Sequence, residues 1–131
     1  MDFLLDTQIW LWAFLEKERI RKKVGVVLED PRNRLWLSPV SVWEALVLFQ
    51  KRRIKLDGDP AAWIRNALAK GFVREAGMTH EIARQSRLIE LSNEDPADRF
   101  IAATAQVRGF TLITADASLL ECSSVRTLAN K

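Results

Sequence analysis

The segment Phe3-Leu4-Leu5-Asp6-Thr7 decides the fold class, because a short apolar run ends there in an acidic residue. Such a run, bounded by a turn-forming residue, is typical of a buried strand. The chain becomes helical in pattern directly afterwards, and either Asp6 or Thr7 is suited to cap the N-terminus of that helix. The segment therefore predicts a strand that leads straight into a helix.

The same order of strand and helix recurs along the chain. Apolar runs predict strands at Leu35–Ser38 and Phe110–Thr114, and weaker strands are predicted at Phe72–Glu75 and Val125–Leu128. Short apolar strands that alternate with helices indicate a parallel sheet covered by helices on both faces, an α/β sandwich. Helical spacing is found in five further segments, which are Arg19–Glu29, Val42–Arg53, Ala61–Lys70, Thr79–Leu91 and Pro96–Val107.

Length and composition limit the class of protein. The chain has 131 residues and a mass of 15.0 kDa, which predicts one domain over residues 1–131. Hydrophobic residues make up 48% and charged residues 28% of the sequence, a globular balance. No apolar stretch approaches the ~20 residues of a membrane-spanning helix. The N-terminus also lacks a secretion-signal pattern, so we expect a cytoplasmic protein that does not contact membranes.

The small number of Cys and His residues restricts the possible metal chemistry. The sequence has one Cys, Cys122, and one His, His80. These exclude an internal disulfide and a zinc site built from nitrogen and sulfur ligands. Any metal ion must therefore be bound by oxygen. The net charge of +3 is compatible with a nucleic-acid partner but does not by itself indicate one.

Acidic residues occur where the predicted strands end or the following helices begin. In parallel sheets, sites form outside the carboxyl ends of the strands. Each acid also has a purely structural explanation, since Ser41–Glu44 matches a capping box and Asp95–Asp98 matches a helix start. The four candidates are Asp6, Glu44, Asp98 and Asp116.

The coincidence of four acids at one edge favours a functional interpretation. Gathered carboxylates disfavour each other's ionised forms unless a cation lies between them. Mg²⁺ and Mn²⁺ prefer carboxylate oxygens and keep several waters. Such ions can activate a water and stabilise the leaving oxygen of a phosphodiester. The pattern therefore predicts hydrolysis of a nucleic-acid backbone.

Four motifs in this order and spacing resemble those of the PIN-domain ribonucleases, and more closely the VapC-type toxins of toxin–antitoxin pairs. The resemblance runs from residue 2 to about residue 120. The motifs are Leu4–Thr7, Ser41–Glu44, Asp95–Arg99 and Leu112–Asp116.

The resemblance implies a three-layer α/β/α sandwich with a central parallel sheet. It also implies an Mg²⁺- or Mn²⁺-dependent endoribonuclease that cleaves RNA with a metal-activated water, a cognate antitoxin and a homodimer. Its metal-binding and catalytic acids map onto Asp6, Glu44, Asp98 and Asp116, of which Asp6 and Asp98 are the leading ligands. Three supporting residues are Thr114, which would orient a ligand or water, Asp95, a helix cap or outer group, and Arg99, a phosphate contact or an ion-pair partner. Many relatives have His two residues before the Asp-Pro pair, where this chain has Asn93.

Two other features of the sequence allow both a structural and a functional interpretation. The segment Ile9–Leu15 is apolar nearly all round, so it is either buried on several sides or packs on a partner through Trp10 or Trp12. Basic residues gather in two clusters, which are either solvated helix ends or phosphate contacts. The clusters are Lys17, Arg19, Arg21, Lys22 and Lys23, and then Lys51, Arg52, Arg53 and Lys55.

Three other functions are compatible with an acidic α/β domain and compete with a ribonuclease. A haloacid-dehalogenase-like phosphatase needs a second Asp two residues after the first, where this chain has Gln8. A receiver domain needs a phospho-accepting Asp at the end of a central strand, where Ser38 and Pro39 follow the second strong strand. A catalytically silent PIN-like scaffold that only binds RNA would have lost an acid, and all four are present.

Overall fold

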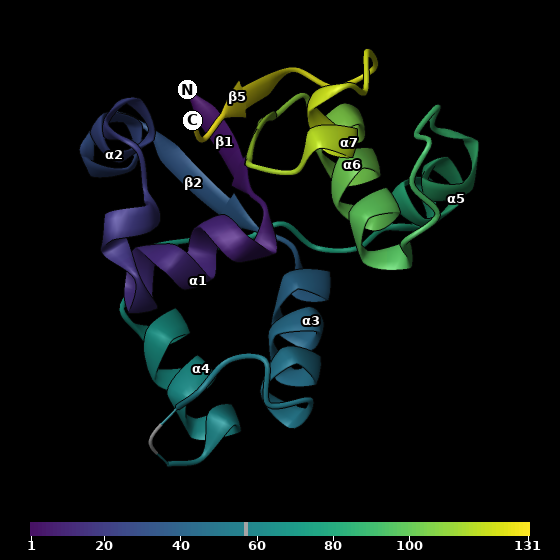
Figure 1. Ribbon diagram of the computed structural model, residues 1–131. Coiled ribbons are helices and arrows are strands. Elements are labelled where there is room, and N and C mark those ends of the chain that lie inside the picture. Colours follow the sequence, from purple (N-terminus) through teal and green to yellow (C-terminus); the bar gives the residue numbers. More distant parts are fainter. Residues whose placement is uncertain (57) are drawn as a thin grey trace.

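The computed structural model describes residues 1–56 and 58–131, which form a five-stranded parallel sheet and the helices around it (Figure 1). The strands are β1 (Asp2–Leu5), β2 (Arg34–Leu37), β3 (Arg74–Glu75), β4 (Thr111–Thr114) and β5 (Thr127–Ala129). The helices are α1 (Thr7–Leu15), α2 (Lys22–Glu29), α3 (Pro39–Gln50), α4 (Pro60–Ala69), α5 (His80–Leu88), α6 (Pro96–Arg108) and α7 (Ala117–Leu120), with a 3-10 turn at Lys17–Arg19.

The sheet has the order β3-β2-β1-β4-β5, and each neighbouring pair is parallel. The strands β1 and β4 are therefore adjacent, and neither lies at an edge of the sheet. Because parallel strands end at the same edge, the residues that follow β1 and β4 are brought together. The N-terminal motif and the motif around Thr114 thus meet although 108 residues separate Asp6 from Thr114.

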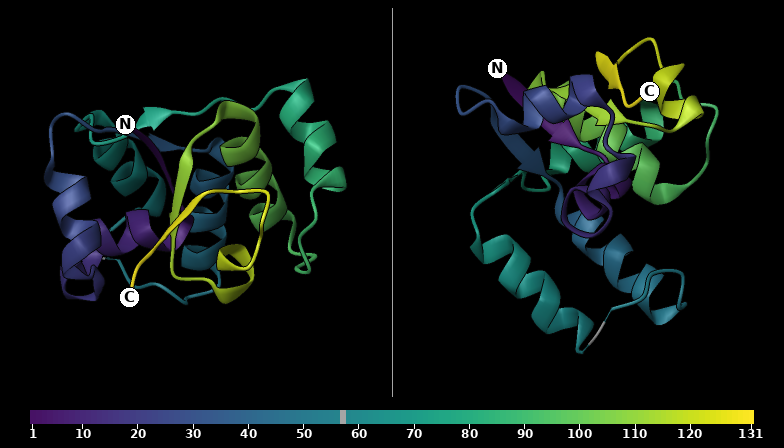
Figure 2. Two further views of the ribbon diagram at one scale, coloured as in Figure 1. Left: turned by 90° about the horizontal axis from the view of Figure 1, so that it is seen from above. Right: turned by 60° about the vertical axis from the view of Figure 1, so that its left-hand side comes forward.

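Alternate residues of the strands point to opposite faces of the sheet, and each face carries its own core. Phe3 and Leu5 face a core built with α1, α2, α3 and α4. Leu4 and Leu112 face a second core built with α6 and α7. Figure 2 shows α1 and α2 on one side of the strands and α6 on the other, with α5 packed outside α6. The predicted three-layer α/β/α sandwich is confirmed.

The helix α1 is apolar nearly all round because it is covered on several sides. Ile9, Trp10 and Leu11 are buried. Trp10 packs against Phe14 and against Trp63 of α4. Burial inside the domain therefore explains why position 10 is apolar, whereas the Trp12 side chain is only half-buried. Within the described residues, none of the helices combines the length and apolar character that a bilayer crossing needs.

The start of α3 differs from the predicted capping box. Ser38 is the N-cap, since its Oγ accepts a hydrogen bond from the Val40 N–H at 3.1 Å, and Pro39 takes the first helical position. Proline is favoured there because its fixed φ suits the helix and its missing N–H is not needed. Ser41 instead lies inside the helix, where its Oγ accepts a hydrogen bond from the Thr7 hydroxyl at 2.9 Å. Glu44 is therefore not used as a cap.

Candidate metal-binding active site

Asp6 lies at the C-terminal end of β1 and is held rigidly. Its backbone N–H donates to the Ile113 carbonyl at 3.0 Å, which ties it to β4. Its Oδ1 accepts from the Thr7 N–H at 2.8 Å, and its Oδ2 accepts from the Thr114 hydroxyl at 2.7 Å. The residue is only 6% exposed. Asp6 is thus both the cap of α1 and a buried carboxylate in a fixed position.

Asp116 follows β4 and is linked to Asp6 through Thr114. The Thr114 hydroxyl donates to Asp6 and accepts from the Asp116 N–H at 3.0 Å. The Asp116 Oδ1 caps α7 by accepting from the N–H of Ser118 at 2.8 Å and from its hydroxyl at 2.6 Å. Thr114 therefore links the two acids, since its hydroxyl contacts the Asp6 carboxylate and the Asp116 backbone.

Asp98 lies in the first turn of α6, where two neighbours fix its surroundings. Asp95 caps the helix, since its Oδ1 accepts from the Asp98 N–H at 3.2 Å. Asn93 donates its side-chain amide to Asp98 Oδ2 at 2.5 Å and to the Ser118 hydroxyl at 3.1 Å. Asn93 and Ser118 thus connect Asp98 to Asp116. Sequence reasoning missed this link, because nothing local indicates that residues 25 positions apart are paired.

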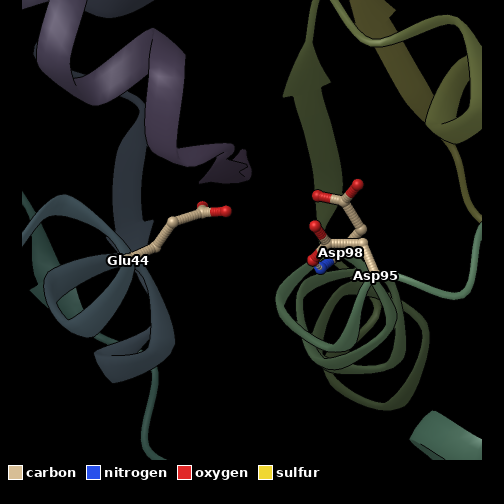
Figure 3. A group of neighbouring side chains, drawn as sticks. All are labelled: Glu44, Asp95 and Asp98. Carbon is tan, nitrogen blue, oxygen red and sulfur yellow. Dashed lines mark hydrogen bonds between the residues drawn. The ribbon is translucent and has the colours of Figure 1, made fainter. Parts of the chain in front are cut away.

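Glu44 of α3 completes the cluster from the opposite side. Figure 3 shows its carboxylate pointing from α3 toward Asp95 and Asp98 at the start of α6. Glu44, Asp95 and Asp98 each offer a carboxylate oxygen, and these oxygens lie within 4.8 Å of one another. Asp95, expected to be a cap first, is therefore both a cap and a member of the closest group of acids.

All five acids line one cavity of about 360 Å³ at the carboxyl edge of the sheet. Its other walls are formed by Gln8, Trp12, Leu48 and Ala115, so its described lining contains no Lys or Arg. No cationic side chain of this described lining balances the negative charge. The acids are Asp6, Glu44, Asp95, Asp98 and Asp116.

Burial and mutual repulsion shift the titration of these acids in one direction. Burial raises the pKa of Asp6 to about 6, Glu44 and Asp116 add to the shift, and the hydrogen bonds from Thr114 and Thr7 oppose it. Burial also raises the pKa of Asp98 to about 7, and the surrounding carboxylates add to this shift. The pKa of Glu44 is raised by burial and by Asp95. The cavity therefore favours either protons or a cation.

These shifts predict that the cation-free protein becomes less stable as pH rises. A carboxyl whose pKa is raised on folding binds more protons in the folded state, so its stabilising effect is present at low pH and is lost as pH rises through the folded pKa. For Asp6 this pH window runs from 3.8, the ordinary pKa of the carboxyl, to about 6, its pKa in the folded protein. The loss is on the order of 3 kcal/mol at 1.36 kcal/mol per pKa unit.

Urea unfolding in EDTA between pH 4 and pH 7.5 measures this effect. The difference in unfolding free energy between the wild type and Asp6→Asn should change with pH across that window, because only the wild type titrates at this position. A difference that stays constant with pH would show that Asp6 is not destabilised by burial.

The donor set fits a hard divalent cation. The oxygen ligands, the missing countercharge and the raised pKa values are the properties that Mg²⁺ and Mn²⁺ sites share. Glu44, Asp95 and Asp98 would hold an ion between α3 and α6. Asp6 and Asp116 face the same cavity from β1 and β4. A cation there would replace the repulsion among the acids by attraction.

Of the two roles expected for Arg99, a phosphate contact or an ion pair with an acid, the structure favours the second, because the side chain is turned into the protein and is only 5% exposed. Its guanidinium donates to one backbone carbonyl in the last turn of α5 and to three in the connection between α5 and α6, and it pairs with Glu94 at 3.7 Å. Arg99 is therefore not available to contact a phosphate, and it holds the loop that leads to Asp95 and Asp98. The four carbonyls belong to Ser86, Ile89, Leu91 and Asn93.

Comparison with known proteins agrees with this arrangement. Residues 3–123 match the PIN domain, so the chain belongs to the PIN-domain family. Within that family it is similar to a VapC protein, since it is 32% identical over 117 residues to "Ribonuclease VapC22" of Mycobacterium tuberculosis, covering 88% of each chain.

Two solved structures share the fold at lower sequence identity. The DNA-bound VapBC of Salmonella typhimurium superposes with a TM-score of 0.73 at 19% identity, over 100% of this chain and 99% of that one. A toxin–antitoxin complex of Klebsiella pneumoniae superposes with a TM-score of 0.61 at 22% identity, over 93% of each chain.

Proposed function

We propose that this protein is a divalent-cation-dependent endoribonuclease and the toxin of a toxin–antitoxin pair, with residues 1–131 forming one nuclease domain. The observation that carries the proposal is the convergence of five carboxylates on one cavity whose described walls hold no Lys or Arg. The similarity to a VapC ribonuclease supports RNA as the substrate.

The acids have distinct tasks in this proposal. Glu44, Asp95 and Asp98 hold a cation, because their oxygens already lie within 4.8 Å of one another. Asp6 is fixed by Thr7 and Thr114, so it presents its charge in one orientation. Asp116 faces the cavity beside Asp6. A bound Mg²⁺ or Mn²⁺ supplies the Lewis acidity that makes a water nucleophilic at neutral pH and neutralises charge on the phosphodiester.

The protein's own contribution is preorganisation. Thr114, Asn93 and Ser118 restrain the carboxylates by hydrogen bonds, so little reorganisation is needed when substrate binds. The half-buried side chains of Trp12 and Leu48 form the apolar part of the cavity wall beside the cluster. No His lines the described cavity, so proton transfer at this site falls to the carboxylates.

Two protein partners belong to the same proposal, namely a cognate antitoxin and a second copy of this chain. The antitoxin is supported by the similarity to a toxin–antitoxin complex. The homodimer is supported by Trp43 of α3, which lies one residue from Glu44 and is 58% exposed. Exposed aromatic residues are enriched at protein interfaces.

Cleavage of total cellular RNA by antitoxin-free protein tests the proposal. Wild type and Asp6→Asn are compared in Mg²⁺, in Mn²⁺ and in EDTA. We expect cleavage by the wild type with either cation, none in EDTA and little by the variant. Equal cutting by both proteins, or cutting that survives EDTA, would reject the proposal. If neither protein cuts RNA but both bind it, the chain is a scaffold.

A further inference from the structure

A second cavity, of about 530 Å³, adjoins the acidic one and has the opposite charge. It lies between the end of α1 and the segment that follows α3, and that segment turns back toward α1 (Figure 1). Its basic residues come from both basic clusters of the sequence, Arg19 from the first and Arg52, Arg53 and Lys55 from the second. The fold therefore joins parts of two clusters that lie 33 positions apart in sequence, counted from Arg19 to Arg52.

The two cavities share a wall. Gln8 and Trp12, which both project from α1, line the acidic cavity and the basic cavity. By contrast, Lys17, Arg21 and Lys22 line a separate and more apolar cavity. Of the first basic cluster, Arg19 therefore lies beside the acidic cavity, whereas Lys17, Arg21 and Lys22 line a different cavity.

The side of the basic cavity next to α1 is formed by Trp12, Glu16 and Arg19, and Arg19 contacts the other two. The Arg19 guanidinium lies over the Trp12 ring at 5.3 Å and pairs with Glu16 at 3.1 Å. The backbone around Arg19 is held by the buried side chain of Asn130, which donates to the Arg19 carbonyl at 3.0 Å and accepts from the Arg21 N–H at 2.8 Å. Contacts within the protein therefore place the Arg19 guanidinium over the Trp12 ring.

The second side is set by an unusual turn. Arg52 has a φ of 56°, the left-handed conformation that costs a residue other than glycine about 1–2 kcal/mol. This turn ends α3 and redirects the chain, so that Arg53 and Lys55 line the same cavity as Arg19. Arg52, Arg53 and Lys55 are exposed, and the described residues provide no ion-pair partner for them.

The two cavities carry opposite charges and therefore interact differently with RNA. The basic cavity carries four positive side chains and one negative one, Glu16, for a net charge of +3. An RNA phosphate is repelled by the acidic cavity until a cation binds there, whereas it is attracted by the basic cavity with or without that cation. Lys and Arg contacts to phosphates are the main source of salt-dependent affinity for nucleic acids.

We propose that the basic cavity binds backbone phosphates of the RNA next to the one that is cleaved, with Trp12 and Gln8 at the boundary between the two positions. This inference rests on the proposed ribonuclease function and assigns it a binding subsite. Arg52, Arg53 and Lys55 bind phosphate, while Arg19 and Glu16 hold the Trp12 ring in position. The aromatic ring offers a surface on which a base of a single strand can stack.

The test measures binding separately from cleavage. The host protein is the full chain with Asp98→Asn, and fluorescence anisotropy reports its affinity for a labelled single-stranded RNA in EDTA over a series of salt concentrations. Arg52→Gly with Arg53→Ala removes two charges, and glycine suits the positive φ at position 52, so folding is preserved. Lys55→Ala is a second, independent variant.

The matched control is Arg65→Ala with Arg84→Ala, which removes two charges from exposed positions of α4 and α5 outside both cavities. We expect the double variant at positions 52 and 53 to weaken RNA binding about tenfold or more. The slope of log affinity against log salt concentration should become shallower by about 1.4, because each phosphate contact on a single strand contributes about 0.7. Lys55→Ala should weaken binding less, and the control should bind as the host does.

An equal loss of RNA affinity in the control variant would show that only the net charge of the protein matters. Unchanged affinity in the double variant at positions 52 and 53 would exclude the subsite. Absence of RNA binding by the host would also overturn the inference. If the wild type fails to cleave RNA while the loss of binding is specific to positions 52 and 53, the proposed activity fails and the subsite stands. In an active background, the double variant should raise KM for RNA more than it lowers kcat.

Discussion

Replacing Asp98 by Asn is expected to lower cation-dependent RNA cleavage by more than ~100-fold, which exceeds the ~10–100-fold effect of losing an outer-shell group at a metal site. Asp98 feels the charge of the whole cluster, since Asp6, Asp95, Asp116 and Glu44 all raise its pKa after the effect of burial. Asparagine keeps the shape and one oxygen, and that oxygen can still accept from the Asn93 amide. What is lost is the negative charge and one cation ligand.

Two measurements separate this effect from damage to the fold. In EDTA, Asp98→Asn should unfold at least as high in temperature as the wild type, because one of the repelling carboxylates has been removed. Added Mn²⁺ should raise the melting temperature of the wild type but not that of the variant. Wild-type cleavage by Asp98→Asn would mean that the cluster is not the active site.

A matched carboxylate outside the cavity provides the control. Asp59 caps α4 by accepting a hydrogen bond from the Ala62 N–H at 3.3 Å. Asparagine is an equally good N-cap. Asp59→Asn removes the same charge as Asp98→Asn and should retain cleavage, stability and the response to Mn²⁺.

The largest effect on stability is expected for Arg99→Met. The guanidinium satisfies four backbone carbonyls, one in the last turn of α5 and three in the segment between α5 and α6. Methionine fills part of the volume but donates no hydrogen bond, and each buried acceptor left unpaired costs about 1–3 kcal/mol. We expect a loss of about 3 kcal/mol or more, equivalent to a decrease of about 10 °C or more in Tm for a chain of this size.

Arg84→Met is the control for Arg99→Met. Arg84 is exposed on α5, and substitutions at such positions change stability by no more than about 0.5 kcal/mol. Arg99→Lys distinguishes the two interpretations of Arg99. If its task is to hold the loop, lysine restores little stability because one ammonium cannot reach four carbonyls. Full stability of Arg99→Lys with weakened RNA binding would instead indicate a phosphate contact.

The fold and the main acids could be predicted because their signals are local. Phe3–Leu5 and Leu112–Ile113 are apolar runs that form the central strands, and an acid soon after each strand must lie at the carboxyl edge. The start of α3 could not be predicted in the same way. Ser38 and Ser41 are both suitable caps by sequence, and Ser41 is drawn into the helix by its contact with Thr7, 34 residues away.

Arg99 shows a second limit of local reasoning. Its position beside Asp98 suggested a shared role at the cavity. Consecutive residues of an α-helix, however, point about 100° apart, since a turn takes 3.6 residues. With Asp98 facing the cavity, Arg99 faces the protein interior. The link from Asn93 to Ser118 depends on how α7 packs against α6, which no sequence motif encodes.

The most direct test of the central claim, that the acidic cavity hydrolyses RNA with a cation-activated water, is to identify the ends of the RNA products. Attack by water leaves no cyclic phosphate, whereas attack by the neighbouring 2′-hydroxyl of the RNA produces a 2′,3′-cyclic phosphate without any need for a metal ion. Mass spectrometry of a short RNA cut by the wild type in Mn²⁺ should therefore detect only linear ends, and EDTA should abolish them. Cyclic phosphate ends that persist in EDTA would contradict the account.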